Sequence, residues 1–180
     1  MGADVTLSHP PARPVQCYVV AVGSNRRGRH GSPHAEVAAA LDALGGLASP
    51  ILASAPLGPS SRTFANAVAL VPSGLEPPAM LAMVKAIERD FGRRAGRRWG
   101  PRVIDLDLIL WSGGAWSSPG LTIPHPAFRA RGFVLAPLAR VAPAWRDPLT
   151  GARVRHLLAR LSRPSPRRVV RSSVGRASDF

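Results

Sequence analysis

The sequence is poor in cysteine, lysine and tyrosine, and it contains no long apolar run. Each of these three residue types occurs once among 180 residues, and aromatic residues make up 6%. Cys17 cannot form an internal disulfide, and its apolar surroundings favour a buried thiol in a reducing cytoplasm. No stretch approaches the roughly 18 apolar residues of a membrane span, and residues 1–14 lack the apolar core of a signal peptide. We therefore expect a soluble, cytoplasmic protein without a membrane partner.

The common nucleotide-binding loops are absent as well. The single lysine, Lys85, follows Val84 where a P-loop requires glycine, so the chain has no P-loop. Residues 23–28 follow an expected strand but lack the Gly-x-Gly of a dinucleotide fingerprint. His30 and His34 have metal-ligand spacing only on a shared helix, which the proline between them disfavours, and both are interpreted as solvated loop residues.

Positive charge is what the chain has in excess. The net charge is +14, and 23 of the 24 basic residues are arginine. This charge suggests a polyanionic partner, but the arginine bias is equally typical of a GC-rich genome. From residue 163 onward the composition shifts to Arg, Ser and Pro without an apolar period. We expect a disordered segment at 1–14, one domain at 15–162 and a disordered tail at 163–180.

Apolar periodicity predicts an α+β domain. Strands are expected at residues 16–22, 51–55, 64–71 and 104–110. Helices are expected after Ser32 and Pro33 as far as Gly45, from about residue 77 to Gly92, over 131–138, and around Val154 to Leu161. The order strand-helix-strand, repeated, is that of a ferredoxin-like sandwich with a mainly antiparallel sheet and appended helices.

Asp105 and Asp107 are the most informative residues. Every second residue from Ile104 to Leu110 is a large aliphatic, so the two carboxylates are expected side by side on the opposite strand face, roughly 6.6 to 7 Å apart. Such a pair can bind one or two divalent cations, and magnesium prefers oxygen ligands. Arginines at 93, 94, 97, 98 and 102 bring donors for phosphate oxygens. The segment therefore predicts a nucleotide phosphate site, although an exposed Asp-x-Asp that is salt-bridged to arginine would have the same pattern.

Four ordered segments within residues 16–160 resemble the 6-hydroxymethyl-7,8-dihydropterin pyrophosphokinase family. They are Tyr-Val-Val-Ala-Val-Gly-Ser-Asn at 18–25, Ala-Pro-Leu-Gly at 55–58 with Phe-Ala-Asn at 64–66, Arg-Trp-Gly-Pro-Arg-Val-Ile-Asp-Leu-Asp-Leu at 98–108, and Leu-Thr-Ile-Pro-His at 121–125 with Arg-Gly-Phe at 131–133. The third segment is the most specific. The resemblance implies an enzyme that transfers pyrophosphate from ATP to the pterin alcohol in folate biosynthesis and releases AMP.

The resemblance also implies roles for individual residues. Asp105 and Asp107 would bind two Mg²⁺ ions, and Arg93 and Arg102 would be catalytic arginines on the phosphates. The ATP-binding residues would be Glu88, Arg98, Trp99, Leu108, Thr122, His125 and Arg131. The pterin-binding residues would be Ser54, Ala55, Leu57, Phe64, Asn66 and Phe133. Without the resemblance, Phe64 and Phe133 would equally fit a hydrophobic core, Asn66 a turn cap, and His125 a structural role.

The chain departs from the family pattern at several positions. Residues 52–54 are Leu-Ala-Ser where the family commonly has a triplet such as Tyr-Arg-Thr, Phe64 is often tyrosine, and Pro126 is often tyrosine. The pterin loop and the arginine loop each look about one residue short. These differences concern loop closure and ATP affinity more than the reaction type.

Two other readings remain open. A nucleic-acid-binding module fits the charge, but it would need exposed aromatic residues on its sheet where this chain carries two aspartates. A protein of the same fold that binds pterin without turnover is the second alternative. The partners we expect are small molecules, ATP and the pterin, with no specific nucleic acid. The sequence is compatible with a monomer and leaves the oligomeric state open.

Overall fold

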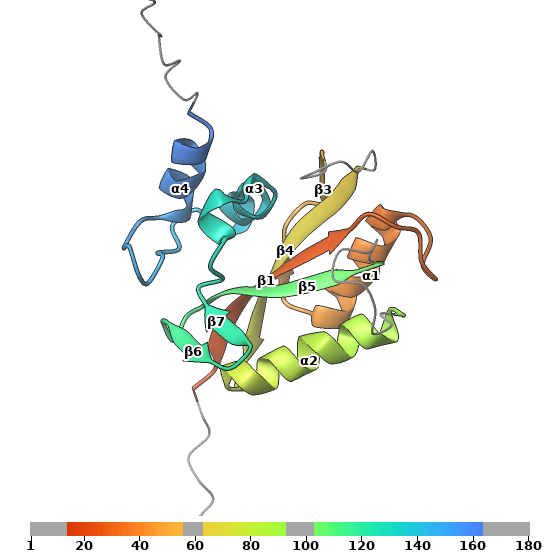
Figure 1. Cartoon of the computed structure of the whole chain (residues 1–180), viewed down its shortest axis with the longest axis horizontal. Helices are drawn as coiled ribbons and strands as arrows, with labels where there is room; N and C mark the ends of the chain where they lie inside the picture. Colours follow the sequence, from red (N-terminus) through yellow and green to blue (C-terminus); the bar gives the residue numbers. More distant parts are fainter. Residues whose placement is uncertain (1–13, 56–62, 93–102, 164–180) are drawn as a thin grey trace, which may run out of the picture.

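The computed structural model describes residues 14–55, 63–92 and 103–163, which form a five-stranded antiparallel sheet with helices on both faces (Figure 1). The terminal segments expected to be disordered lie outside these ranges, except for Pro14 and Arg163. Within the described ranges, none of the helices combines the length and apolarity that a bilayer span requires.

The sheet is built around β1 (Gln16–Ser24), which lies between β4 (Phe64–Ser73) and β5 (Asp105–Trp111). The strand order is β2-β4-β1-β5, with β2 (Leu47–Ala48) and β3 (Leu52–Ser54) both paired to β4, and every pairing is antiparallel. The ferredoxin-like order predicted from the sequence is therefore confirmed.

The expected strand at 51–55 is shorter in the structure, and β2 was not expected. Pro50 lies between β2 and β3 and has no N–H to donate to a sheet, so one strand cannot run through this position. β1 and β4 extend beyond their expected ends to Ser24 and Ser73.

Two helices cover one face of the sheet. α1 (Pro33–Leu44) begins where the Ser32 side chain accepts a hydrogen bond from the Ala35 N–H, and it ends at Gly45, whose φ is 69°. α2 (Pro77–Asp90) buries Met80 and Val84 at a spacing of four residues. The core beneath these helices takes alternate residues of the strands, including Val20, Ala67 and Leu106.

The opposite face is covered by α3 (Gly132–Val141) and α4 (Val154–Leu161), which pack on Val19, Val68 and Ile109 (Figure 1). Both helices were expected from the sequence, with α3 ending three residues later than predicted. Helices thus cover part of each face, and the accessible end of the α3 face carries Asp105 and Asp107 where the nucleic-acid alternative requires exposed aromatic residues.

The link between β5 and α3 contains a hairpin and a short helix that the sequence did not predict. β6 (Trp116–Ser118) pairs with β7 (Leu121–Ile123), the Ile123–Pro124 peptide bond is cis, and the 3₁₀ helix η1 (Phe128–Ala130) leads into α3. Strands of three residues are too short for a period of two to be recognised.

Candidate active site

Asp105 and Asp107 lie on the face of β5 that α3 covers, as the alternation of the strand predicted. Both are half-buried, while Leu106 and Leu108 between and beside them are buried in the opposite core. The face does not stay polar along the strand, because Ile109 is fully buried against α3 and α4. The two carboxylates thus lie at the start of β5, and the rest of this strand face packs in the hydrophobic core.

The strand register places the aspartates in two rows across the sheet. Gly23 of β1 pairs with Asp105 on one side and with Asn66 on the other, and Ala21 pairs in the same way with Asp107 and Val68. The central residues, Gly23 and Ala21, thus place little or no side chain between the two outer strands. A Cβ on Gly23 would lie 3.2 Å from the Asn66 Oδ1, so a larger residue would press on Asn66.

Asn66 is held by the neighbouring strand. Its side chain is 5% exposed, and its Nδ2 donates a hydrogen bond of 2.8 Å to the Ser54 Oγ. Ser54 is paired with Phe64 in the β3–β4 ladder. Phe133, near the start of α3, packs partly against the core under that helix, which also contacts β3. The structure therefore gathers Ser54, Phe64 and Asn66 at one end of the sheet.

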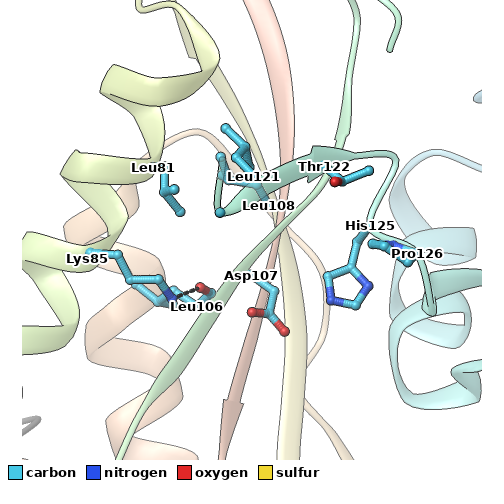
Figure 2. Close-up of a pocket in the computed structure, with 10 residues that line it drawn as sticks. Leu81, Lys85, Leu106, Asp107, Leu108, Leu121, Thr122, His125 and Pro126 are labelled. Atoms are coloured by element: carbon cyan, nitrogen blue, oxygen red, sulfur yellow. Dashed lines mark hydrogen bonds between the residues drawn. The ribbon is translucent and has the colours of Figure 1, made fainter. Parts of the chain in front are cut away.

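A pocket of about 410 Å³ opens on the other side of the aspartates, between α2, β5 and the β6–β7 hairpin (Figure 2). Asp107 and His125 lie at one end, and four leucines form the apolar wall. Its lining residues are Leu81, Lys85, Leu106, Asp107, Leu108, Gly120, Leu121, Thr122, His125 and Pro126. A volume of this size and a wall of this kind are typical of small-molecule sites.

β5 is an edge strand, and α2 satisfies part of its outer edge. The buried Glu88 accepts a hydrogen bond of 2.8 Å from the Leu106 N–H, and the Lys85 Nζ donates one of 2.9 Å to the Leu106 carbonyl. Lys85 and Glu88 are also paired with each other at 2.8 Å. Glu88, which the resemblance assigned to ATP, is thus 1% exposed and bonded to the β5 backbone.

His125 is fixed over β5 by its backbone and by its ring. Its N–H donates to the Ile109 carbonyl at 2.9 Å, and its Nδ1 accepts from the Ala127 N–H at 3.1 Å. Burial lowers the pKa of the imidazole, although the nearby Asp107 acts to raise it. The ring is therefore neutral at pH 7, and because Nδ1 is an acceptor, Nε2 carries the proton.

Arg131 completes the charged end of the site. Its Nη1 lies 3.5 Å from the Asp107 Oδ2, and its guanidinium carbon lies 5.8 Å from the centre of the Phe133 ring. Both side chains of the ion pair are about one-third exposed, at 30% and 34%, so solvent and ligands can reach them. Arg131 therefore lies between Asp107, which lines the pocket, and the aromatic ring of Phe133.

The donor set fits a hard divalent cation. Two carboxylates supply oxygen ligands, and the described residues contain no group of three or more His, Cys, Asp or Glu side chains that could hold a metal by themselves. A cation at this position would therefore need further oxygens from phosphates or water, which is how magnesium is commonly held beside nucleotides.

Several residues implied by the resemblance lie outside the described ranges: Leu57, Arg93, Arg98, Trp99 and Arg102. Conversely, the pocket is lined by residues that the sequence did not assign, including Lys85, Leu81 and Gly120. The only signal for Lys85 was that it is the single lysine in an arginine-rich chain. Ala55 lies exposed at the end of β3.

The described residues thus form an α+β fold that brings two carboxylates, His125 and Arg131 together beside a pocket. The chain belongs to the 7,8-dihydro-6-hydroxymethylpterin-pyrophosphokinase (HPPK) family, whose model matches residues 19–143.

Curated relatives carry the corresponding name. The 2-amino-4-hydroxy-6-hydroxymethyldihydropteridine pyrophosphokinase of Pseudomonas aeruginosa is 40% identical over 153 residues, which cover 81% of this chain and 91% of that protein. The protein of the same name from Synechocystis is 42% identical over 101 residues, which cover 56% of this chain but only about half, 52%, of that protein.

A solved structure shares the fold. The crystal structure of wild-type Plasmodium falciparum HPPK-DHPS with STZ-DHP aligns with a TM-score of 0.64 at 13% identity, covering 84% of this chain and 44% of that chain. At this identity the likeness supports the fold alone.

Proposed function

We propose that this protein transfers pyrophosphate from ATP to 6-hydroxymethyl-7,8-dihydropterin, giving the pterin diphosphate and AMP in folate biosynthesis. One observation carries the proposal: Asp107 lines a 410 Å³ pocket, while its neighbour Asp105 pairs with Gly23, which pairs on its other side with Asn66. The carboxylates thus separate a nucleoside-sized pocket from a polar and aromatic region. A reaction that transfers a phosphate-containing group between two substrates requires its metal ligands to lie between the two substrate sites.

The nucleoside would occupy the pocket. The backbone groups of Leu106 that point toward α2 are bonded to Glu88 and Lys85. By the alternation of an antiparallel strand, those of Leu108 point toward the same edge and border the pocket, where a purine edge can pair with them. Leu81 and Leu121 would pack on the base, with Thr122 at the rim. In this arrangement Glu88 supports nucleoside binding indirectly, because it holds the backbone of β5 at Leu106 in place.

The triphosphate would extend toward Asp107, where His125 and Arg131 supply donors. The neutral His125 can donate from Nε2, and the Arg131 guanidinium can bind phosphate oxygens. The resemblance also assigns residues outside the described ranges. On that ground we propose that Arg93 and Arg102 are catalytic and that Arg98 and Trp99 bind ATP. Two Mg²⁺ ions are proposed on Asp105 and Asp107.

The pterin would bind between Phe64 and Phe133, with its edge read by Asn66 and by backbone groups near Ser54, Ala55 and Leu57. A flat heterocycle needs such an aromatic slot together with fixed donors and acceptors. The hydrogen bond from Asn66 to Ser54 fixes the orientation of the amide before the substrate arrives.

The protein's part in the reaction is alignment, charge balance and exclusion of water. Bound magnesium would neutralise phosphate charge and lower the pKa of the pterin hydroxyl. Asp105 and Asp107 orient the two substrates toward each other, Arg131 balances negative charge on the phosphates, and the leucine wall keeps water from the pocket. No described side chain is needed as a general base.

The test is AMP formation by the purified protein with ATP, magnesium and the reduced pterin alcohol. We expect Asp107→Ala to reduce AMP formation more than tenfold while the protein stays folded, since a half-buried carboxylate contributes its ligand function and little stability. Asp42→Ala, which removes an exposed aspartate of α1, is the matched control and should leave the rate unchanged. The proposal fails if Asp105→Ala and Asp107→Ala each keep more than about a tenth of the activity. Such a loss corresponds to a rise of less than roughly 1.4 kcal/mol in the activation free energy, too little for two metal ligands.

The cytoplasm is the proposed location, on the ground that a single cysteine cannot form an internal disulfide. A monomer is the proposed state, and sedimentation of the purified protein tests it.

A further inference from the structure

The half-buried Arg129 and the buried Asp147 form a bidentate ion pair that the proposed mechanism does not use. The Arg129 Nε and Nη2 donate to the two carboxylate oxygens of Asp147, each at 2.7 Å. Asp147 is 1% exposed, and the guanidinium lies over the ring of the fully buried Phe128 at 4.7 Å. Paired hydrogen bonds between a guanidinium and a carboxylate fix orientation as well as distance.

The carboxylate is held on its other sides by its own loop. It accepts hydrogen bonds from the Leu149 N–H at 3.1 Å and from the Thr150 hydroxyl. The backbone of Asp147 is bonded to Gly151 and Ala152. Burial acts to raise the pKa of the Asp147 carboxyl, but the hydrogen bonds from Arg129, Thr150 and Leu149 outweigh it and lower the pKa. The pair is therefore charged at neutral pH and rigid.

The pair sits on the short segment that joins the two basic groups of the site. Arg129 belongs to η1, four residues after His125 and two before Arg131. The segment is bonded within itself, since the Phe128 N–H donates to the His125 carbonyl and the Arg131 N–H donates to the Phe128 carbonyl, each at 3.1 Å. At its start, the His125 N–H is fixed to β5. At its end, the Arg131 carbonyl accepts hydrogen bonds from the Val134 and Leu135 N–H groups of α3. Between these two ends, the Arg129 side chain is held by Asp147.

We propose that Asp147 is a positioning residue for the ATP site, which holds Arg131 and His125 in place through Arg129. The link between α3 and α4 thereby takes part in nucleotide binding without touching the nucleotide. This role rests on the proposed function, because it assumes that Arg131 binds the triphosphate.

The experiment is a double-mutant cycle on ATP affinity, measured by calorimetry with magnesium in the full chain. Asp147→Asn removes the charge that holds the guanidinium, and Arg129→Lys keeps the positive charge but loses the paired geometry. We expect each to weaken ATP binding about tenfold, the value of one charge-assisted hydrogen bond. Thr150→Val is the matched control, because it removes one hydrogen bond to the same carboxylate without touching Arg129, and it should change the affinity by less than about twofold.

The cycle separates positioning from general stability. If Asp147 acts through Arg131, Asp147→Asn should weaken ATP binding by less than about twofold further in an Arg131→Ala background. An equal loss in both backgrounds, an unchanged affinity in Asp147→Asn, or an equal effect of Thr150→Val would overturn the proposal. So would unfolding of both Asp147→Asn and Arg129→Lys at the assay temperature. A protein that binds ATP but forms no AMP would refute the proposed function while leaving this cycle intact.

Discussion

Phe64 differs from the other aromatic residues that the structure describes in how it is buried. It is half-buried and belongs to neither hydrophobic core, whereas Phe128 is fully buried and Phe133 packs against the core under α3. From the sequence alone, Phe64 and Phe133 were equally compatible with core positions. Phe64 is thus partly accessible, as the proposed contact with the pterin requires.

We expect Phe64→Ala to weaken pterin binding by roughly 0.5 to 1.5 kcal/mol through lost stacking, with ATP binding nearly unchanged. Pterin titration and thermal melting of the same samples check this. Phe128→Ala is the contrasting variant, because removal of a core phenylalanine should cost about 3 to 5 kcal/mol of stability. If Phe64→Ala melts as early as Phe128→Ala, Phe64 is a core residue.

Some single-residue interactions follow from the sequence and others do not. The orientation of Asp105 and Asp107 was predictable because a period of two fixes the face of a strand side chain. The bonds of Lys85 and Glu88 to β5 were not, since they join residues 18 and 21 positions apart. His30 was interpreted as a solvated loop residue, but its Nδ1 lies 2.8 Å from the buried Glu36.

At the level of elements, the loop between β1 and α1 is tied to both helices beneath the sheet. Glu36 of α1 is fully buried and accepts hydrogen bonds from the backbone N–H groups of His30 at 2.6 Å and Gly31 at 3.1 Å. The His30 ring packs on Phe91 at the end of α2, with 4.7 Å between ring centres. A Cβ on Gly28 would come within 2.7 Å of Glu36 and 2.3 Å of Val103, two residues before Asp105.

We expect Glu36→Ala to destabilise the protein by about 1 to 3 kcal/mol, because it removes a buried carboxylate that accepts two backbone hydrogen bonds of the loop. Chemical denaturation measures this free energy, and Asp42→Ala on the exposed side of the same helix should change it by less than about 0.5 kcal/mol. Equal stabilities of the two variants would mean that the loop finds other partners.

The pocket shows what element prediction from the sequence leaves out. Its walls come from α2, β5 and the β6–β7 hairpin, which are separated along the chain. α2 and β5 were predicted from strong periodicity, but the hairpin has three residues per strand, and its position over α2 depends on tertiary packing. The aspartates could therefore be identified before the structure, whereas the cavity beside them could not.

For the whole molecule, the order of strands and helices was enough to predict the topology. Two strand-helix-strand units interleave to give the observed order, because each helix must return the chain to the same sheet. That α3 and α4 would close the second face was not predicted, although both helices were. Their apolar faces need a partner, and the side of the sheet that carries Val19, Val68 and Ile109 provides it.

Deletion of residues 163–180 should leave AMP formation and the melting temperature unchanged. α4 ends at Leu161, and the sequence beyond it has no apolar period that could dock on the domain. This segment carries five arginines and one aspartate, a net charge of +4, so the shortened protein should lose part of any salt-sensitive retention on RNA. Turnover that falls several-fold on truncation would instead mean that the domain extends past residue 162.

The bonds from α2 to the outer edge of β5 have a consequence for solubility. An edge strand with unpaired backbone groups invites a strand from another molecule to join the sheet, and this is a common route to aggregation. Leu106 has both of its outward backbone groups occupied by side chains, one of them the only lysine of the chain. At Leu106 the edge beside the pocket is thus closed to a strand from a second copy of the protein.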